Sequence, residues 1–295
     1  MSRTSIHVMK IVDIIYRYEA RDTSASLRPS HTDAALRRLE DGNKTFAALF
    51  ESTADRNIVQ CIVPVDSREL GLLLSTGEGP KQHPFAVILG CSDARVPIEL
   101  IFNEGPNDLF VIRVAGNSLG TEVLGSLKYA IDYLSQSLKL IVVLGHSGCG
   151  ALTTAVDVFL NPSDYLPLVS KHSLRSILDR LLIVVDACAR KLSVTFGADV
   201  VRRPGYRRAL IEASIVTNAA LASYSIRREL GDNNLTGLKV VYGVYLLDTR
   251  EVWSPFRERG YSGLATAPDT DAAFSQLGDE IARSKRIASL IEGNQ

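Results

Sequence analysis

Four short, predominantly apolar runs place the strongest constraint on how this chain folds. They cover residues 85–89, 109–114, 140–144 and 238–242. A strand with one face in water alternates apolar and polar residues, whereas a strand buried on both faces, as in a parallel sheet, is apolar throughout. Between the second and third runs a helix is indicated by apolar residues at helical spacing, namely Val123, Leu127, Ala130, Ile131 and Leu134. This alternation predicts an α/β fold with a central, mostly parallel β-sheet flanked by helices.

Two polar motifs follow the first and third runs directly. Residues 91–95 read CSDAR, and residues 146–149 read HSGC. Neighbouring parallel strands bring the side chains at their carboxyl ends to one edge of the sheet. Cys91, His146 and Cys149 therefore form a candidate metal site of two thiolates and one imidazole. Zinc held by three protein ligands keeps a fourth position open for water, which distinguishes catalytic from structural zinc.

The other two cysteines, Cys61 and Cys188, lie in apolar segments and are predicted to pack as small buried hydrophobic residues. Four cysteines in 295 residues do not form a disulfide-dense scaffold, and a repeated Cys-x-x-Cys pattern typical of structural zinc is absent. Since a reducing compartment would keep the ligand thiols free for metal, we expect a cytoplasmic protein.

The charge balance argues against a polyanionic partner. Lysine plus arginine number 33, as do aspartate plus glutamate, so the formal net charge is zero and nothing points to nucleic acid or an anionic membrane. No run approaches the roughly 18 apolar residues of a membrane span. Residues 1–19 are predicted to form an amphipathic helix rather than a signal peptide, with Val8, Ile11, Val12 and Ile15 on one face.

Three regions are expected along the chain. Residues 1–30 form the N-terminal helix and a polar linker, residues 31–256 the catalytic domain, and residues 257–295 a C-terminal helical extension. Within the domain, a helix is predicted to begin at Thr32, and a helix-rich stretch to run from Cys149 to about residue 230 with breaks near Pro162 and Pro204. A bend near Asp248 precedes a second short strand, and the C-terminal helix begins near Asp271.

Together these motifs resemble the β-class carbonic anhydrases. The Cys-x-Asp-x-Arg and His-x-x-Cys motifs carry the resemblance, and residues 110–117 (FVIRVAGN) match the family's second strand and the turn after it. The resemblance runs from about residue 36 to residue 252. It implies Zn²⁺ bound by Cys91, His146 and Cys149, with water, hydroxide or Asp93 as the fourth ligand. It also implies a homodimer or higher homo-oligomer, with N-terminal helices embracing the partner.

The activity that the resemblance implies is reversible hydration of carbon dioxide to bicarbonate and a proton by a zinc-bound hydroxide. A metal cation supplies hydroxide near neutral pH by lowering the pKa of bound water. The three-histidine carbonic anhydrases are the standard example, with a water pKa of about 7. Because two thiolates donate more charge than imidazoles, we expect a higher water pKa here and activity that favours alkaline pH.

Asp93 and Arg95 are the candidate catalytic pair. Asp93 lies two residues after a ligand, where it either binds zinc or accepts a hydrogen bond from hydroxide, and Arg95 holds its carboxylate off the metal in a bidentate pair. The alternative is a surface salt bridge, which contributes only about 0–1 kcal/mol.

Three residues are candidates for substrate contact. Gln82 lies nine residues before Cys91, where plant-like β-class enzymes carry a glutamine that hydrogen-bonds substrate. Phe110 and Tyr129 match aromatic positions that line the plant-like cleft. A loop-capping role for Gln82 and a core position for Phe110 remain open alternatives.

Other functions are consistent with the same motifs. Relatives with these ligands hydrolyse carbonyl sulfide or carbon disulfide, and a non-catalytic zinc- or bicarbonate-binding subunit would keep Asp93 on the metal. A dinucleotide-binding protein is excluded, because the turn after the first apolar run lacks a Gly-x-Gly-x-x-Gly sequence.

Overall fold

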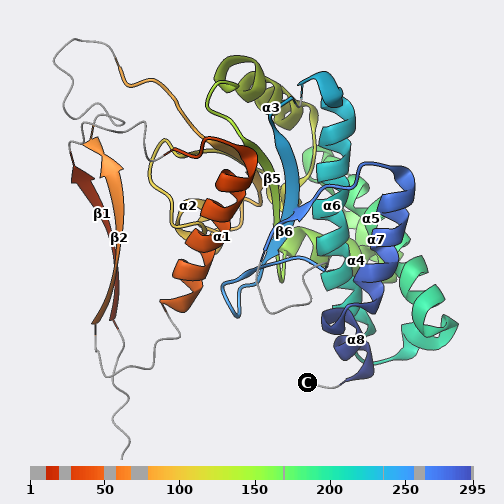
Figure 1. Ribbon diagram of the computed structural model, residues 1–295. Helices are drawn as coiled ribbons and strands as arrows, with labels where there is room; N and C mark the ends of the chain where they lie inside the picture. Colours follow the sequence, from red (N-terminus) through yellow and green to blue (C-terminus); the bar gives the residue numbers. More distant parts are fainter. Residues whose placement is uncertain are drawn as a thin grey trace, which may run out of the picture.

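The protein is built around one six-stranded sheet. The computed structural model describes residues 11–19, 28–49, 58–67, 79–168, 170–234, 236–255 and 263–293. The strands run in the order β4-β3-β5-β6-β7, with β8 also paired to β6 (Figure 1). Their bounds are β3 (Ala86–Gly90), β4 (Leu109–Arg113), β5 (Leu140–His146), β6 (Lys239–Tyr245), β7 (Val252–Trp253) and β8 (Ala265–Thr266). Strands β4, β3, β5 and β6 are mutually parallel and coincide with the four apolar runs, so the predicted parallel sheet is confirmed.

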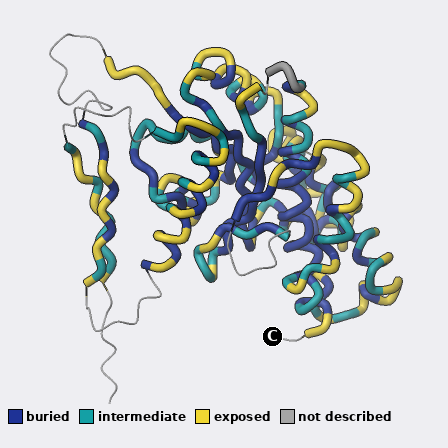
Figure 2. The backbone as a smooth tube through the Cα atoms, in the orientation of Figure 1, coloured by how far each residue is buried: buried dark blue, intermediate teal, exposed yellow. Residues whose placement is uncertain are grey.

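Helices cover both faces of this sheet, which explains why its strands are mostly apolar. One face packs on α1 (Thr32–Ala48) and α2 (Ile98–Ile101). The other packs on a thicker layer comprising α3 (Thr121–Leu134), α4 (Gly150–Leu160), α5 (His172–Phe196), α6 (Tyr206–Asn234), α7 (Asp271–Arg283) and α8 (Lys285–Glu292). The two faces are read directly from β3: Ile88 joins the cluster of α1 and α2, whereas Leu89 joins the larger cluster. In Figure 2 the sheet is the buried centre of the molecule.

Helix α6 is the one described helix long and apolar enough to cross a membrane by length and composition. Its candidate span, Tyr206–Gly231, is 83% buried against the rest of the protein over its most apolar window. A long helix whose apolar part is buried in this way is a core helix. It packs against β5 and β6 as well as α5, α7 and α8.

Most expected helix boundaries are confirmed. Helix α1 begins at Thr32, where the His31 side chain accepts a hydrogen bond from the Ala34 N–H at 3.2 Å. Helix α4 ends at Leu160, before the 3₁₀ turn Pro162–Leu168. A second 3₁₀ turn, Ala198–Arg202, lies between α5 and α6. The predicted C-terminal helix starts at Asp271 but is divided by Ser284, which caps α8 through the Ile287 N–H.

The helix predicted over residues 1–19 is wrong for its described part. Residues 11–19 form strand β1 (Ile11–Glu19), which pairs in parallel with β2 (Ile58–Asp66), a strand that the sequence reasoning missed. β-Branched Ile11, Val12, Ile14 and Ile15 favour an extended backbone, and this preference outweighed the helical spacing. Val8 and most of the linker lie outside the described residues.

Candidate metal centre

Three elements deliver the predicted ligands to one point. Cys91 follows the last residue of β3, His146 is the last residue of β5, and Cys149 is the residue before α4. Strands β3 and β5 are adjacent and parallel, with Gly90 opposite Leu144, so the residues after them emerge at the same edge of the sheet. The sequence-based placement of this site at the carboxyl ends of the strands is therefore confirmed.

The ligand atoms of Cys91, His146 and Cys149 are gathered closely enough for one metal ion. All three lie within 4.8 Å of one another, and the three residues are at most 5% exposed. His146 Nδ1 lies 3.0 Å from the Ser147 carbonyl oxygen, which assigns the Nδ1–H as a donor. Its Nε2 is buried and has no hydrogen-bond partner. Two thiols and an unpaired imidazole nitrogen are the donor set that zinc prefers, so the residues fit a zinc ion.

The thiols of Cys91 and Cys149 shift each other's pKa in opposite directions. A hydrogen bond with Cys149 lowers the pKa of Cys91, with further help from His146 and against the effect of burial. The Gly116 N–H also donates to Cys91 Sγ at 3.3 Å. The pKa of Cys149 is raised by the same contact with Cys91 and by burial. Because cysteine binds a metal ion as the thiolate, metal binding at this site would release protons.

Asp93 lies beside the metal site and is held by Arg95. Arg95 donates from Nε to Asp93 Oδ1 at 3.0 Å and from Nη2 to Oδ2 at 2.7 Å, and its backbone N–H donates to Oδ1 at 2.9 Å. Asp93 Oδ2 lies 3.8 Å from His146 Nε2. The hydrogen bond from Arg95 holds the pKa of Asp93 well below its usual range, against the effect of burial. The bidentate pair predicted from the sequence is present.

Arg113, at the end of β4, fixes the loop that carries Cys91 and Asp93. Its Nε donates to the Cys91 carbonyl oxygen at 3.0 Å, and its Nη2 donates to the Asp93 carbonyl oxygen at 2.6 Å. Sequence reasoning did not identify this residue. The sequence feature that could have identified it is a single charged residue in an otherwise apolar strand, within the segment 110–117 that resembles the family.

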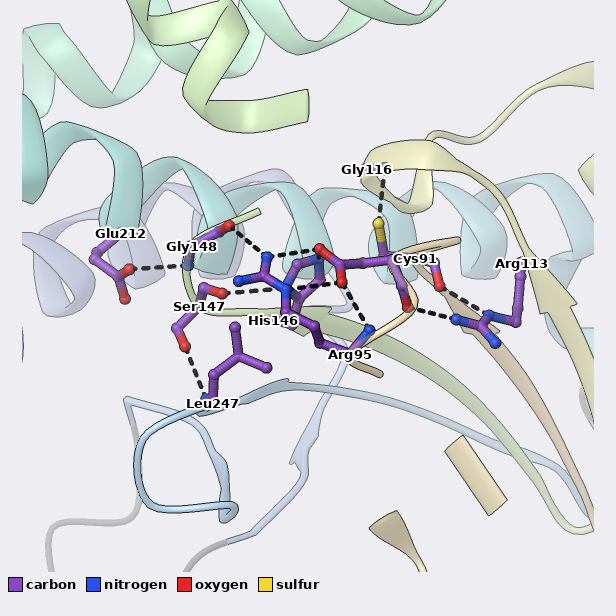
Figure 3. A network of polar contacts seen from close by, with 10 residues as sticks. Cys91, Arg95, Arg113, Gly116, His146, Ser147, Gly148, Glu212 and Leu247 are labelled. Carbon is purple, nitrogen blue, oxygen red and sulfur yellow. Dashed lines mark hydrogen bonds and ion pairs between the residues drawn. The ribbon is translucent and has the colours of Figure 1, made fainter. Parts of the chain in front are cut away.

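A second set of contacts holds the loop that carries His146 and Cys149 (Figure 3). Gly148 adopts a left-handed φ of 63°, and its N–H donates to Glu212 Oε1 of α6 at 3.4 Å. Arg286 of α8 donates to Glu212 Oε2 at 2.9 Å. Ser147 Oγ accepts a hydrogen bond from the Leu247 N–H at 2.9 Å. Nothing in the sequence pointed to Glu212 or Arg286, because their roles depend on the packing of α6 against α8.

The candidate substrate residues do not lie next to the three candidate metal ligands of this chain. Phe110 pairs with Val87 of β3. Val87 lies four residues before Cys91, so Phe110 is about 13 Å from Cys91 along the strand direction. Its ring packs against the larger core cluster and lies 6.3 Å from the ring of Tyr129, which is 46% exposed.

Gln82 is exposed, and it lies in the segment before β3. Asn107, in the turn before β4, bonds to both neighbours of Gln82: its Oδ1 accepts from the His83 N–H, and its Nδ2 donates to the Lys81 carbonyl oxygen. The structure thus brings Phe110 and Tyr129 together, but it places neither them nor Gln82 beside the ligands of the same chain. Their contact with substrate stays a prediction.

Comparisons with known proteins identify relatives of this chain. Residues 86–251 match the family model described as carbonic anhydrase. Carbonic anhydrase 2 of Mycobacterium tuberculosis is 40% identical over 123 residues, which cover 42% of this chain and 52% of that protein. A carbonic anhydrase of Mycolicibacterium smegmatis is 36% identical over 152 residues, 50% of this chain and 66% of that protein. The chain therefore spans about half to two thirds of the length of these relatives.

Solved structures with some similarity include two β-carbonic anhydrases. One is the Coccomyxa enzyme in complex with acetazolamide, at 26% identity and a TM-score of 0.42, covering 59% of this chain and 72% of that chain. The other comes from a study of two tetrameric enzymes of Sordaria macrospora, at 22% identity and a TM-score of 0.42, covering 59% and 81%.

Proposed function

The chain belongs to the β-class carbonic anhydrase family, and we propose that it catalyses the reversible hydration of carbon dioxide to bicarbonate and a proton at a zinc ion. Cys91, His146 and Cys149 would hold the metal. The observation that carries the proposal is the buried, unpaired Nε2 of His146 facing two thiols within 4.8 Å. A buried polar atom without a partner costs about 1–3 kcal/mol, and a metal ligand bond removes that cost.

Zinc, when bound, supplies the Lewis acidity that generates hydroxide from water near neutral pH. Asp93 is the nearby acceptor: its Oδ2 lies 3.8 Å from the ligand atom of His146, so it is within reach of a molecule at the fourth metal position. Because Arg95 keeps the carboxylate charged, Asp93 would accept a hydrogen bond from a bound water or hydroxide and orient it. Held by Arg95, the Asp93 carboxylate would stay off the metal and leave a position for water.

The site is also shaped to keep its geometry during turnover. Arg113 donates hydrogen bonds to the carbonyl oxygens of Cys91 and Asp93. Glu212 accepts one from the Gly148 N–H, which lies between the other two candidate ligands in the sequence. Rigid support of this kind holds ligands and acceptor in their working arrangement. All four cysteines are unpaired, which supports the further proposal of a reducing, cytoplasmic location.

The test is stopped-flow hydration of carbon dioxide on protein whose zinc content has been measured, at about pH 7 and about 1.5 pH units higher, a range chosen to bracket titration of the metal water. Turnover that depends on zinc at either pH supports the proposal. Absence of turnover at both, with zinc present, contradicts it. Sulfide release from carbonyl sulfide by the same sample would assign the site to that substrate instead.

A further inference from the structure

Strands β1 and β2 form a small sheet of their own at the margin of the molecule (Figure 1). Within the described residues β1 pairs only with β2, over nine residues in parallel. The inner face of the sheet contributes Val12, Ile14 and Val59 to the cluster beside α1. Its outer face leaves Ile11 and Ile15 of β1 43% and 37% exposed, next to Ile58 and Ile62 of β2. Parallel sheets are normally larger and buried on both faces, so in the part of the chain that the structure describes this pair of strands lacks a neighbour.

Pro64 determines which backbone groups are free at the other edge of β1. It lies opposite Arg17 in the parallel register. Since proline has no N–H, the hydrogen bonds at this position are made by the N–H and carbonyl of Arg17. Backbone direction alternates along a strand, so the odd-numbered residues of β1 bond to β2. The even-numbered ones, Val12, Ile14, Tyr16 and Tyr18, present their N–H and carbonyl groups at the free edge.

We propose that this free edge pairs antiparallel with β1 of a second copy of the chain, about a two-fold axis at Ile15. In that register Ile14 lies opposite Tyr16 of the second copy, and Val12 opposite Tyr18, so all four residues with free backbone groups meet as hydrogen-bonded pairs. The result is a four-stranded sheet, β2-β1-β1-β2. The free edge of β2 is less suited to pairing with another strand, because Pro64 lies there and has no N–H to donate.

The side chains of β1 favour this register by charge. Pairing about Ile15 places Asp13 directly opposite Arg17 of the second copy, twice by symmetry, and Ile15 opposite itself. Opposite charges in directly facing positions stabilise an antiparallel pair. A shift of the axis to Tyr16 would set Asp13 against Glu19, a like-charge pair, and a shift to Ile14 would leave Asp13 against Ile15. Only the axis at Ile15 pairs all nine residues.

This interface also changes the expected role of the N-terminus. The family resemblance led us to expect helices that embrace a partner, whereas the described part of the segment is a strand. A strand with one open, self-complementary edge associates through backbone hydrogen bonds, and a two-fold interface of this kind closes on itself.

Disulfide trapping tests the register. In a non-hydrogen-bonded antiparallel pair the two Ile15 Cα atoms lie about 4.5 Å apart, within the range that a disulfide spans. Ile15→Cys is expected to form a covalent dimer with oxidised glutathione, seen as doubled mass on non-reducing gels. Ile11→Cys is the matched control: it is exposed on the same face, but the two copies lie eight residues apart, about 26 Å. Failure of Ile15→Cys to cross-link in folded protein, or equal cross-linking at Ile11, overturns the proposal.

Charge exchange tests the same interface without a covalent bond. Asp13→Arg and Arg17→Asp each create two like-charge pairs across the axis, and each is expected to halve the molar mass measured by light scattering. The double variant Asp13→Arg/Arg17→Asp restores the opposite charges and is expected to recover the mass of the unmodified protein. Single variants that keep the full mass contradict the proposal, as does an unmodified protein that is monomeric.

Discussion

Arg95 donates hydrogen bonds to both carboxylate oxygens of Asp93. Oδ2, which accepts from Arg95 Nη2 at 2.7 Å, also lies 3.8 Å from His146 Nε2. The same Nη2 is 3.3 Å from the Gly148 carbonyl oxygen, so one guanidinium group links the two loops that supply the ligands. A single side chain therefore connects the acceptor to both of the loops that carry the candidate ligands.

Replacing Asp93 by alanine separates metal binding from catalysis. Because the three ligand atoms come from other residues, we expect Asp93→Ala to keep its zinc but to lose roughly 10- to 100-fold in turnover, as for other residues that support a metal site. Asp132→Ala, which removes an exposed carboxylate paired with Lys128, serves as the control and should leave the rate unchanged. Zinc content and stopped-flow rates check both; an unaltered rate in Asp93→Ala would show that the pair is only structural.

Replacing Cys149 by serine should abolish metal binding. A serine hydroxyl is a poor zinc ligand near neutral pH, so we expect Cys149→Ser to lose zinc and activity together. Cys61→Ser is the matched control, because Cys61 is also buried but bonds to Asn103 Oδ1 at 3.1 Å, outside the metal site. Elemental analysis of both variants gives the result, and full activity in zinc-free Cys149→Ser would refute the ligand assignment.

Glu104 makes stability depend on pH. Burial raises the pKa of Glu104 from its ordinary 4.5 to about 8, although hydrogen bonds from Arg38 oppose the shift. Between these values the folded state holds a proton that the unfolded state has lost, so the free energy of unfolding decreases as pH rises. The contribution is complete below about pH 4.5 and is lost as pH passes through about 8.

Urea unfolding of Glu104→Gln at several pH values tests this expectation. The amide cannot titrate, so the difference in unfolding free energy between variant and unmodified protein should change steadily from pH 5 to 8, a window taken from the two pKa values. Titration of the zinc ligands is common to both proteins and cancels in the difference. A difference that is constant across the window contradicts the shift.

Asn43 joins α1 to two distant backbone segments. Its Nδ2 donates to the carbonyl oxygens of Ile101 and Arg250, and its Oδ1 accepts from the Val252 N–H at 2.8 Å. Asn43→Ala leaves these buried groups unpaired, and we expect a loss of about 3 kcal/mol in unfolding free energy. Lys44→Ala, the neighbouring exposed position, should change it by no more than about 0.5 kcal/mol. Denaturant unfolding that ranks the two variants equally would contradict this role.

The sequence predicted the parallel sheet and the metal ligands because both depend on local patterns. An apolar run such as that before Cys91 identifies a buried strand, and the residue just after it must lie at the edge of the sheet. The Asp93–Arg95 pair was predictable for the same reason, since its members lie only two positions apart in the sequence.

Elements that depend on distant partners were not predictable in this way. Ile11 and Ile15 fit one face of a helix as well as a strand, and only pairing with β2, more than 40 residues away, decides between them. Glu212 and Arg286 carry no pattern at all in the sequence. Their importance comes from tertiary packing that places both near Gly148.

The contact from Arg286 to Glu212, and from there to Gly148, sets an order for events during synthesis. A ribosome releases all three candidate ligands once residue 149 has emerged. Arg286, which secures their loop through Glu212, is made more than 130 residues later. A nascent chain can therefore present thiols and imidazole to the cell well before it can hold them rigidly. Rigid support of the candidate ligands through Glu212 is therefore expected only after Arg286 has been synthesised.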